Sequence, residues 1–398
     1  MLQVNNLRLG FVAGKTALAA VDGISFSISR GETFALLGES GCGKSATAQG
    51  IMRLLPAAGR ILGGSIRLDG VELLDMPEAD MRAYRGRRMA MIFQEPATSL
   101  NPVLTVGQQI GEVLDRHLNL RGAPARERML DLLRQVGIAD PERRLDEYPF
   151  QLSGGMKQRV MIAIALAGEP DLLIADEPTT ALDVTVQAQI LDLLARLQAE
   201  RGMAILLITH DLGVVARMAH RIGVMYAGEL VEVAERETFF QRPSHPYTQA
   251  LFAALPEVGR RGLPLATIPG QVPSLAAMPP GCRFAARCAH VMPVCQRSPD
   301  WRGADGEAEV RCHWQGEATP DCTMRHAVTE LDLPPAKPSS KWMPCRCISR
   351  FARASCNAPS GRCARWMAYR SASHRGGRWH WSANPAAARR RPARRCCS

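Results

Sequence analysis

Three short motifs in this chain contain residues whose types and spacing are suited to chemistry. They read GESGCGKS over 38–45, LSGGMKQ over 152–158 and LLIADE over 172–177. The first fits the pattern G-x-x-x-x-G-K-S, a loop that surrounds phosphate groups with backbone amides and one lysine ammonium. The third places two carboxylates directly after four aliphatic residues. The motifs therefore predict a site for a phosphate ester and its divalent cation.

The first motif has the composition that a polyphosphate requires. Gly38, Gly41 and Gly43 let the backbone approach the phosphates without steric bulk. A helix that begins near Lys44 offers unpaired amides and roughly half a positive charge at its N-terminus. We expect the Lys44 ammonium to reach the β- and γ-phosphates and the Ser45 hydroxyl to bind Mg²⁺.

The third motif supplies acidic groups. Two consecutive carboxylates usually form a solvated turn, but these end an apolar strand downstream of a phosphate loop. Successive side chains of a strand point to opposite faces, so the two carboxylates have different surroundings. We expect Asp176 to hold Mg²⁺ through water and Glu177 to polarise the attacking water.

Alternating strands and helices position these motifs. The strands are predicted from apolar or alternating runs at 2–8, 24–30, 33–37, 89–93, 172–175 and 204–208. Apolar residues at helical spacing predict helices from Ser45 to about Leu55, within 105–137, and from Ser153 to about Gly168. This alternation indicates an α/β fold with a parallel core sheet. Frequent proline and glycine predict a loop-rich segment over 256–315.

The charge of the chain is unevenly distributed. The formal net charge is +11, but residues 341–398 contain 14 Lys and Arg and no acidic residue. Removing these 14 leaves 35 basic residues against 38 acidic ones, so we expect no nucleic-acid partner for the folded part. The sequence has no uncharged apolar run of spanning length and no signal-peptide pattern at its start. These features predict a soluble, cytosolic main body.

The three motifs, in this order, resemble those of the ATP-binding-cassette (ABC) ATPases. The resemblance implies a P-loop NTPase fold of the ABC type: an α/β nucleotide-binding domain with a parallel core sheet, an antiparallel β subdomain and a helical subdomain. It implies an ATPase domain over 1–255 and a small loop-rich C-terminal extension over 256–320. Residues 321–398 then form an unstructured basic tail.

The resemblance implies roles for single residues. Gln94 corresponds to a glutamine that senses Mg²⁺, and His210 to a histidine that contacts the γ-phosphate. Phe11 corresponds to an aromatic residue that stacks on adenine, with core packing as the alternative. The expected catalytic residues are Glu177, His210 and Gln94. The expected ATP contacts are Phe11, Gly38, Glu39, Ser40, Gly41, Cys42, Gly43, Lys44, Ser45, Ala46, Ser153, Gly154, Gly155 and Asp183. The expected Mg²⁺ residues are Ser45, Gln94 and Asp176.

The second motif predicts a further anion site, because Ser153 opens a helix whose first amides are unpaired. The resemblance implies that this site faces the γ-phosphate bound to a second ABC ATPase domain or subunit. Asp183 belongs to the loop 181–183, which bridges the two ATPase units. ATP then joins the two domains, and metal-assisted in-line attack by water separates them.

Five further segments resemble the ATPases of oligopeptide, dipeptide, nickel and glutathione importers. They are 92–102, 148–160, 245–247, 253–256 and 268–273. This implies a peripheral protein on the cytoplasmic face of the inner membrane, bound to two transmembrane permease subunits that a solute-binding protein supplies. The alternative is a soluble ABC-type ATPase of DNA repair or translation. Such proteins usually carry long insertions in the ATPase core, and none is visible between Ser45 and Leu152.

Eleven of the twelve cysteines follow position 280, and the other, Cys42, lies in the phosphate loop. Cys282, Cys288, Cys295 and Cys312 have the spacing C-x5-C-x6-C-x16-C, which matches neither a zinc ribbon nor a ferredoxin well. The resemblance to peptide importers suggests a 4Fe–4S cluster. The alternative is four reduced, partly buried thiols.

The basic tail has two interpretations. As an arginine-rich arm it would bind RNA, DNA or an anionic lipid. The single codons of Trp and Met favour another: read in a shifted frame, the segments around 366–374 and 384–389 permit sequences close to 21–28 and 39–44. We therefore expect a frameshift between about 315 and 360 that scrambles the start of a second ABC ATPase domain.

Overall fold

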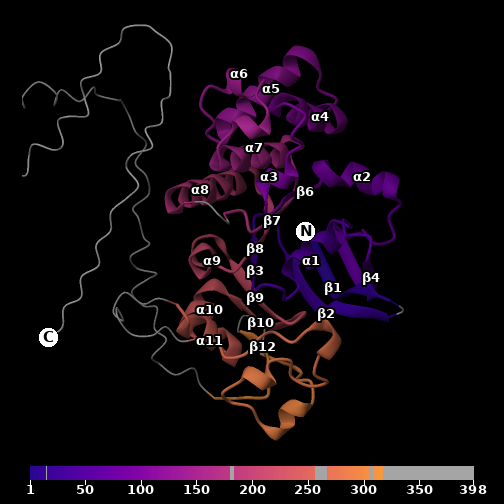
Figure 1. Cartoon of the computed structure of the whole chain (residues 1–398), viewed down its shortest axis with the longest axis vertical. Helices are drawn as coiled ribbons and strands as arrows, with labels where there is room; N and C mark the ends of the chain where they lie inside the picture. Colours follow the sequence, from indigo (N-terminus) through magenta and orange to yellow (C-terminus); the bar gives the residue numbers. More distant parts are fainter. Residues whose placement is uncertain (15, 180–182, 256–266, 304–307, 317–398) are drawn as a thin grey trace, which may run out of the picture. The chain divides into compact units, whose positions relative to one another are not determined.

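Buried aliphatic strands form the core sheet of the computed structural model, which describes residues 1–14, 16–179, 183–255, 267–303 and 308–316 (Figure 1). In this part the core sheet has eight strands in the order β11-β12-β10-β9-β3-β8-β7-β6. Their bounds are β3 (Thr33–Leu37), β6 (Met89–Ile92), β7 (Leu172–Asp176), β8 (Ala204–Thr209), β9 (Arg221–Tyr226), β10 (Glu229–Glu235), β11 (Trp301–Arg302) and β12 (Glu309–Arg311). The strands β9, β3, β8, β7 and β6 are parallel, which confirms the expected fold class.

Among the described residues, a second sheet of four antiparallel strands has the order β2-β1-β4-β5. Its strands are β1 (Leu2–Ala13), β2 (Thr16–Ile28), β4 (Gly59–Leu68) and β5 (Val71–Glu72). In β1 the side chains of Leu2, Val4, Leu7 and Leu9 are buried, while the residues between them are mostly exposed. The inner face packs with α1 (Lys44–Ile51) into one hydrophobic cluster. Each sheet therefore helps to fix the helix that follows the phosphate loop.

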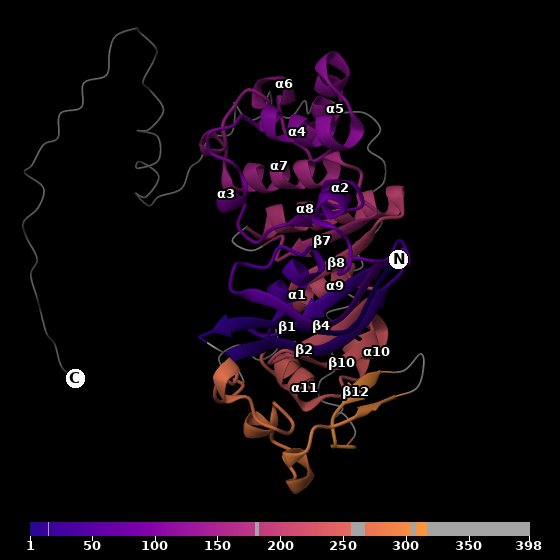
Figure 2. The same ribbon diagram turned by 90° about the vertical axis from the view of Figure 1, so that its right-hand side faces the viewer.

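Helices cover the core sheet and form a separate helical region. The helices after α1 are α2 (Glu78–Arg87), α3 (Pro96–Ser99), α4 (Val106–Leu118), α5 (Gly122–Gln135), α6 (Pro141–Arg144), α7 (Gly154–Ala167), α8 (Val184–Arg201), α9 (Leu212–Met218), α10 (Arg236–Gln241) and α11 (Pro246–Ala253). In the described part of the chain the 3₁₀ helices are η1 (Pro149–Gln151), η3 (Leu275–Ala277), η4 (Ala285–Arg287) and η5 (Pro293–Gln296). In both views α4, α5 and α6 lie on the far side of α7 from the core strands (Figures 1 and 2).

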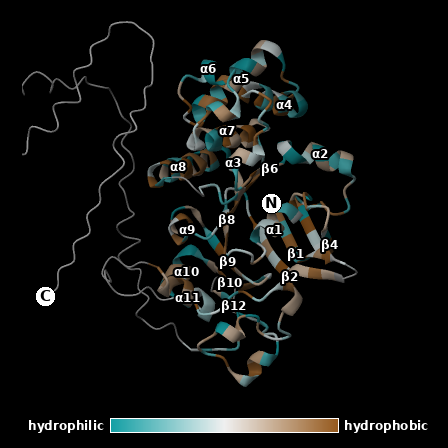
Figure 3. Cartoon of the chain, in the orientation of Figure 1, coloured by the Kyte–Doolittle hydropathy of each residue, from teal (hydrophilic) through white to brown (hydrophobic). Residues whose placement is uncertain are grey.

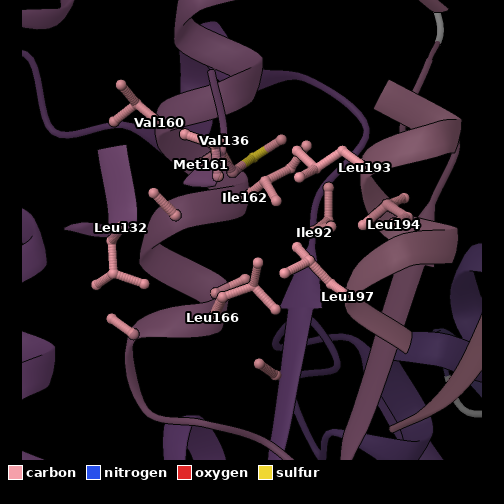
Figure 4. Close-up of a cluster of buried hydrophobic side chains, with 14 of the residues drawn as sticks. Ile92, Leu132, Val136, Val160, Met161, Ile162, Leu166, Leu193, Leu194 and Leu197 are labelled. Carbon is pink, nitrogen blue, oxygen red and sulfur yellow. The ribbon is translucent and has the colours of Figure 1, made fainter. Parts of the chain in front are cut away.

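Apolar packing joins the helical region to the core sheet. Side chains from β6, α7 and α8 meet in one buried cluster that includes Ile92, Ile162 and Leu197 (Figure 4). The helix α2 differs from this apolar cluster, because its residues are mostly hydrophilic (Figure 3). Of its residues only Met81 is buried. The cluster also includes Leu173 and Ala175, so it packs α7, which begins at the second motif, against β7.

The structure corrects two expectations from the sequence. The helix after the phosphate loop ends at Ile51 and not near Leu55, because Arg53 adopts a left-handed backbone with a φ of 51°. The Arg53 side chain instead donates hydrogen bonds to the carbonyls of Leu73 and Met76. The loop-rich segment also contains strands: β12 pairs with β10 and extends the core sheet. The linker 256–266 and the tail beyond 316 lie outside the described residues.

Candidate nucleotide-binding site

The phosphate loop connects β3 to α1, and two of its glycines are required by close packing. A Cβ atom at Gly38 would lie 2.2 Å from the carbonyl oxygen of Met225. Gly43 has a φ of 107°, and a Cβ there would lie 2.7 Å from the Ala20 carbonyl oxygen. L-amino acids other than glycine rarely adopt that backbone conformation. The glycines therefore let the loop lie directly against β2 and β9.

Lys44, the first residue of α1, turns its ammonium back into the loop. Its side chain is buried, and Nζ donates to the carbonyls of Gly38 at 2.7 Å and Glu39 at 2.9 Å. The thiol of Cys42 is fully buried beside it, and burial raises the pKa of this thiol. The side chain of Cys42 is therefore closed to a ligand, and its amide donates to the Glu39 carbonyl at 3.3 Å. The helix start and the buried ammonium together make a strongly anion-binding loop.

Ser45 and Asp176 meet at the ends of α1 and β7. The Ser45 hydroxyl donates to Oδ1 of Asp176 at 3.1 Å, and Asp176 is 3% exposed. Burial raises the pKa of the Asp176 carboxyl, and the neighbouring charge of Glu177 raises it further. Oxygen ligands of this kind suit Mg²⁺, whose charge would favour the ionised carboxylate. The pair therefore has the donor set of a magnesium site.

Glu177 points to different partners from Asp176, as the sequence predicts. The backbone of Glu177 is left-handed, with a φ of 47°, and its amide donates to the Ile208 carbonyl at 2.8 Å. Nε2 of Gln94 donates to its Oε2 at 2.8 Å, while Nδ1 of His210 lies 3.0 Å from its Oε1. Three of the predicted residues thus meet at one carboxylate group, which has the arrangement of a general base.

One cavity of about 300 Å³ brings the predicted residues together. Its lining residues are Phe11, Ala20, Ser40, Gly41, Gly43, Lys44, Ser45, Ala46, Gln94, Glu177 and Leu275. Gly38, Glu39 and His210 line an adjacent cavity of about 330 Å³. Leu275 lies in η3, in the C-terminal extension, and sequence reasoning missed it, because no motif links 275 to the phosphate loop. The cavity has room for phosphates between β2, the loop and Glu177.

The second motif lies apart from this cavity. Ser153 caps α7 by accepting a hydrogen bond from the amide of Met156 at 3.4 Å. Asp183 caps α8 in the same way, through the amide of Val186 at 3.0 Å. A Cβ built on Gly155 would lie 3.2 Å from Val186, so the starts of α7 and α8 are adjacent. Gly154 is the first residue of α7, and residues 180–182 of the bridging loop fall outside the described part.

The four cysteines of the extension lie in one region. Cys295 and Cys312 are buried, Cys282 and Cys288 are half-buried, and all four are free thiols. Burial, followed in part by the charges of neighbouring cysteines, raises the pKa of Cys282, Cys288 and Cys312. Among the described residues, no group of three or more His, Cys, Asp or Glu side chains is placed to hold a metal ion. In the described structure these side chains are four free thiols and not a preformed metal site.

Taken together, the parallel sheet, the phosphate loop and the acidic strand end define a P-loop nucleoside triphosphatase. Residues 21–180 match the model of the ABC transporter family, and residues 231–295 match that of the oligopeptide/dipeptide transporter C-terminal region. The chain belongs to the ABC transporter family and is one of its ATP-binding, ATP-hydrolysing subunits.

Two relatives from Bacillus subtilis (strain 168) are similar over most of their length. The chain is 50% identical to a dipeptide transport ATP-binding protein, DppD, over 75% of this chain and 89% of the relative. It is 52% identical to an oligopeptide transport ATP-binding protein, AppD, over 74% and 90% respectively. A solved dimer of the ATP-binding cassette MJ0796, bound to ADP and Pi, is 29% identical with a TM-score of 0.53, covering 59% of this chain and 99% of that one.

No helix in the described part of the chain is both long and apolar enough to cross a membrane.

Proposed function

We propose that this chain energises the uptake of peptides, or of a peptide-like solute, by hydrolysing ATP beneath a membrane permease. One observation carries the catalytic part: Gln94 and His210 both contact the carboxylate of Glu177 beside the phosphate loop. The cargo class is supported by the names of the relatives, which are dipeptide and oligopeptide transport proteins. It is supported also by the C-terminal region, which matches peptide transporters.

The residues of the site divide the chemical work. We expect Lys44 and the amides of α1 to neutralise the phosphates, and Phe11 to contact the adenine at the other end of the cavity. Ser45, Asp176 and Gln94 would hold Mg²⁺, which neutralises charge on the transferred phosphoryl group. Glu177 would orient and polarise the attacking water, and His210 would move from Glu177 to the γ-phosphate.

A second ATPase domain completes the site in this proposal. Ser153, Gly154 and Gly155 lie at a helix start away from the cavity of their own chain. In an antiparallel pair of domains each helix start would face the γ-phosphate bound to the partner, and Asp183 would lie at the junction. The solved dimer of a similar cassette supports a paired arrangement. Hydrolysis would remove the bridging phosphate and separate the domains.

The same proposal assigns partners and place. We infer two transmembrane permease subunits, a solute-binding protein on the other side of the membrane, and a peripheral position on the cytoplasmic face of the inner membrane. The proposed domains remain the ATPase domain over 1–255 and the extension over 256–320. The names of the two relatives as transport ATP-binding proteins support this assembly.

Transport by the reconstituted complex tests the proposal. The chain is purified with its permease subunits, placed in proteoliposomes, and supplied with a solute-binding protein and labelled dipeptides, oligopeptides, glutathione or nickel chelate. We expect MgATP-dependent peptide uptake that Lys44→Ala abolishes. Uptake of nickel or glutathione alone would overturn the peptide assignment, while an absence of ATP hydrolysis in the complete complex would overturn the catalytic one.

The cysteine cluster is tested separately. The importer resemblance predicts a 4Fe–4S cluster on Cys282, Cys288, Cys295 and Cys312, whereas the described geometry suits free thiols. Iron and acid-labile sulfide analysis of anaerobically purified protein distinguishes the two. About four irons per chain, lost in Cys288→Ser, would support the cluster. A colourless protein without iron would leave four reduced thiols.

The tail carries its own proposal, that a frameshift between about 315 and 360 hides a second ABC ATPase domain. The DNA sequence downstream of codon 315 tests it. A shifted frame that encodes a second phosphate loop supports the proposal, and an early stop in that frame contradicts it.

A further inference from the structure

Glu39, the second residue of the phosphate loop, is fixed from two directions by the C-terminal part of the chain. Its backbone amide donates to the hydroxyl of Tyr247 at 2.9 Å. Its carboxylate accepts from both terminal nitrogens of Arg287, at 2.9 Å from Nη1 to Oε2 and 3.1 Å from Nη2 to Oε1. Two parallel charge-assisted bonds of this kind fix orientation as well as distance.

The surroundings of Arg287 make this contact rigid. Its side chain is 6% exposed, and Nε donates to the Pro269 carbonyl at 2.8 Å. Nη1 also lies 3.3 Å from the hydroxyl of Tyr226. The rings of Tyr226, Tyr247 and Phe284 pack against one another at centroid distances of 4.8 to 5.3 Å. The guanidinium therefore has one well-defined position, set by carbonyls of the extension and by Tyr226 of β9.

The contact continues into the catalytic loop. The carbonyl of Glu39 accepts a hydrogen bond from Nζ of Lys44 at 2.9 Å. A change in the Glu39 backbone would therefore shift the ammonium that we expect to bind phosphate. The path from the extension to the ammonium is Arg287, Glu39, Lys44, and each step is a hydrogen bond on an oxygen of Glu39.

We propose that Arg287 is a positioning residue for nucleotide binding, through which the C-terminal extension fixes the phosphate loop. The proposal rests on the proposed function, because it assumes that the loop binds MgATP. It adds that the extension, which contains no part of the three motifs, determines the affinity of the loop. Binding is affected more than turnover, since the printed hydrogen bonds of Arg287 go to Glu39, to Tyr226 and to two backbone carbonyls of the extension.

The main test compares Arg287→Gln with Arg283→Gln in the full-length chain. Arg283 is a matched control: it lies in the same segment, is 10% exposed, and pairs with Asp22 and Glu229 but not with the phosphate loop. We expect Arg287→Gln to raise the KM and the Kd for MgATP by about tenfold, because the variant loses the charge-assisted contact with Glu39, with a smaller change in kcat. Arg283→Gln should leave the KM within about twofold of wild type, a change that corresponds to less than one RT of binding free energy.

Three further variants separate positioning from folding. Glu39→Gln should raise the KM as much as Arg287→Gln does, and the double variant should be no worse than either, because both remove the same contact. Arg287→Lys should recover only part of the affinity, since an ammonium lacks the planar fork. Tyr247→Phe removes only the hydroxyl that accepts from Glu39, and keeps the ring in the core; it should also raise the KM.

Thermal unfolding of every variant shows which of them fold. If Arg287→Gln does not fold, Tyr247→Phe and Arg287→Lys decide, and wild-type KM values in both would overturn the proposal. Equal KM shifts in Arg287→Gln and Arg283→Gln would also overturn it, as would additive effects in the double variant. Failure of wild type to bind MgATP would instead overturn the proposed function, so the two failures are distinct.

Discussion

The Ser45 hydroxyl donates to the Asp176 carboxylate at 3.1 Å, although the two residues are 131 positions apart in the chain. The contact joins the start of α1 to the end of β7 across the core sheet. It leaves a buried carboxyl whose ionised form is penalised by desolvation, so the site is less stable than its packing would allow. Function and stability are therefore in opposition at this position.

Asp176→Asn should reveal this opposition. The amide oxygen can still accept from Ser45, while the buried charge and its desolvation cost are removed. We expect the free energy of unfolding to be unchanged or higher, and Mg²⁺-dependent hydrolysis to fall by at least about a hundredfold. Urea unfolding and a Mg²⁺ titration of activity measure the two effects. A less stable variant with normal activity would contradict the assignment.

Glu177→Gln should separate binding from hydrolysis. The amide can still contact Gln94 and His210 but cannot accept a proton from water. We expect kcat to fall by about 10² to 10⁴-fold, the usual contribution of a general base, with little change in ATP affinity. In size-exclusion chromatography the variant should accumulate as an ATP-bound dimer. Turnover equal to wild type would remove Glu177 from this role.

His245 should make the protein sensitive to acid. Burial lowers the pKa of His245 to about 3, while the unfolded chain titrates near 6.5. Between these values the unfolded state binds the extra proton, so stability is lost as the pH falls from 6.5 toward 3, at up to about 1.4 kcal/mol per pH unit. His245→Asn keeps a cap for the Tyr247 amide and removes this titration. Its melting temperature should fall less steeply between pH 7 and 5.

A second group that titrates near His245, the carboxyl of Glu232, is present in both proteins of this comparison. Burial raises the pKa of Glu232, which accepts from the amide of His245 and titrates in both proteins. Its contribution therefore cancels in the comparison. Melting curves of wild type and His245→Asn that stay parallel across the pH range would show that His245 is not the acid-sensitive group.

Leu166→Ala tests the packing between the helical region and the core sheet. Leu166 is fully buried in the cluster that joins α7 to β6 and α8 (Figure 4). We expect a loss of about 2–5 kcal/mol in the free energy of unfolding, from lost apolar contact and the cavity left behind. Val184→Ala is the control, because Val184 is 83% exposed and should change stability by less than about 0.5 kcal/mol. Equal losses in both variants would contradict this packing.

Local patterns predicted the parts of the site that lie close in sequence. The apolar run at 33–37 became β3 with the same bounds, and Ser153 caps α7 as its place before two glycines indicates. The meeting of Gln94, Glu177 and His210 followed from a family resemblance, since nothing in their spacing brings them together. The contacts of Leu275 and Arg287 could not be predicted, because they depend on how a segment without periodicity packs.

The boundary at 255 illustrates the same limit. Composition changes there, and the sequence predicts a separate extension. Phe284, however, is 2% exposed and shares a hydrophobic cluster with Phe239, Phe252 and Tyr247. Contacts in a hydrophobic core cannot be predicted from local sequence patterns when the contacting residues come from distant segments of the chain.

The separation of 248 positions between Glu39 and Arg287 has a consequence during synthesis. A ribosome that adds 5–20 residues per second needs about 12 to 50 s to travel from one codon to the other. Throughout that interval the nascent phosphate loop exists without its guanidinium partner. A truncated translation product that stops before Arg287 would thus carry every nucleotide motif and still lack the contact that arrives last.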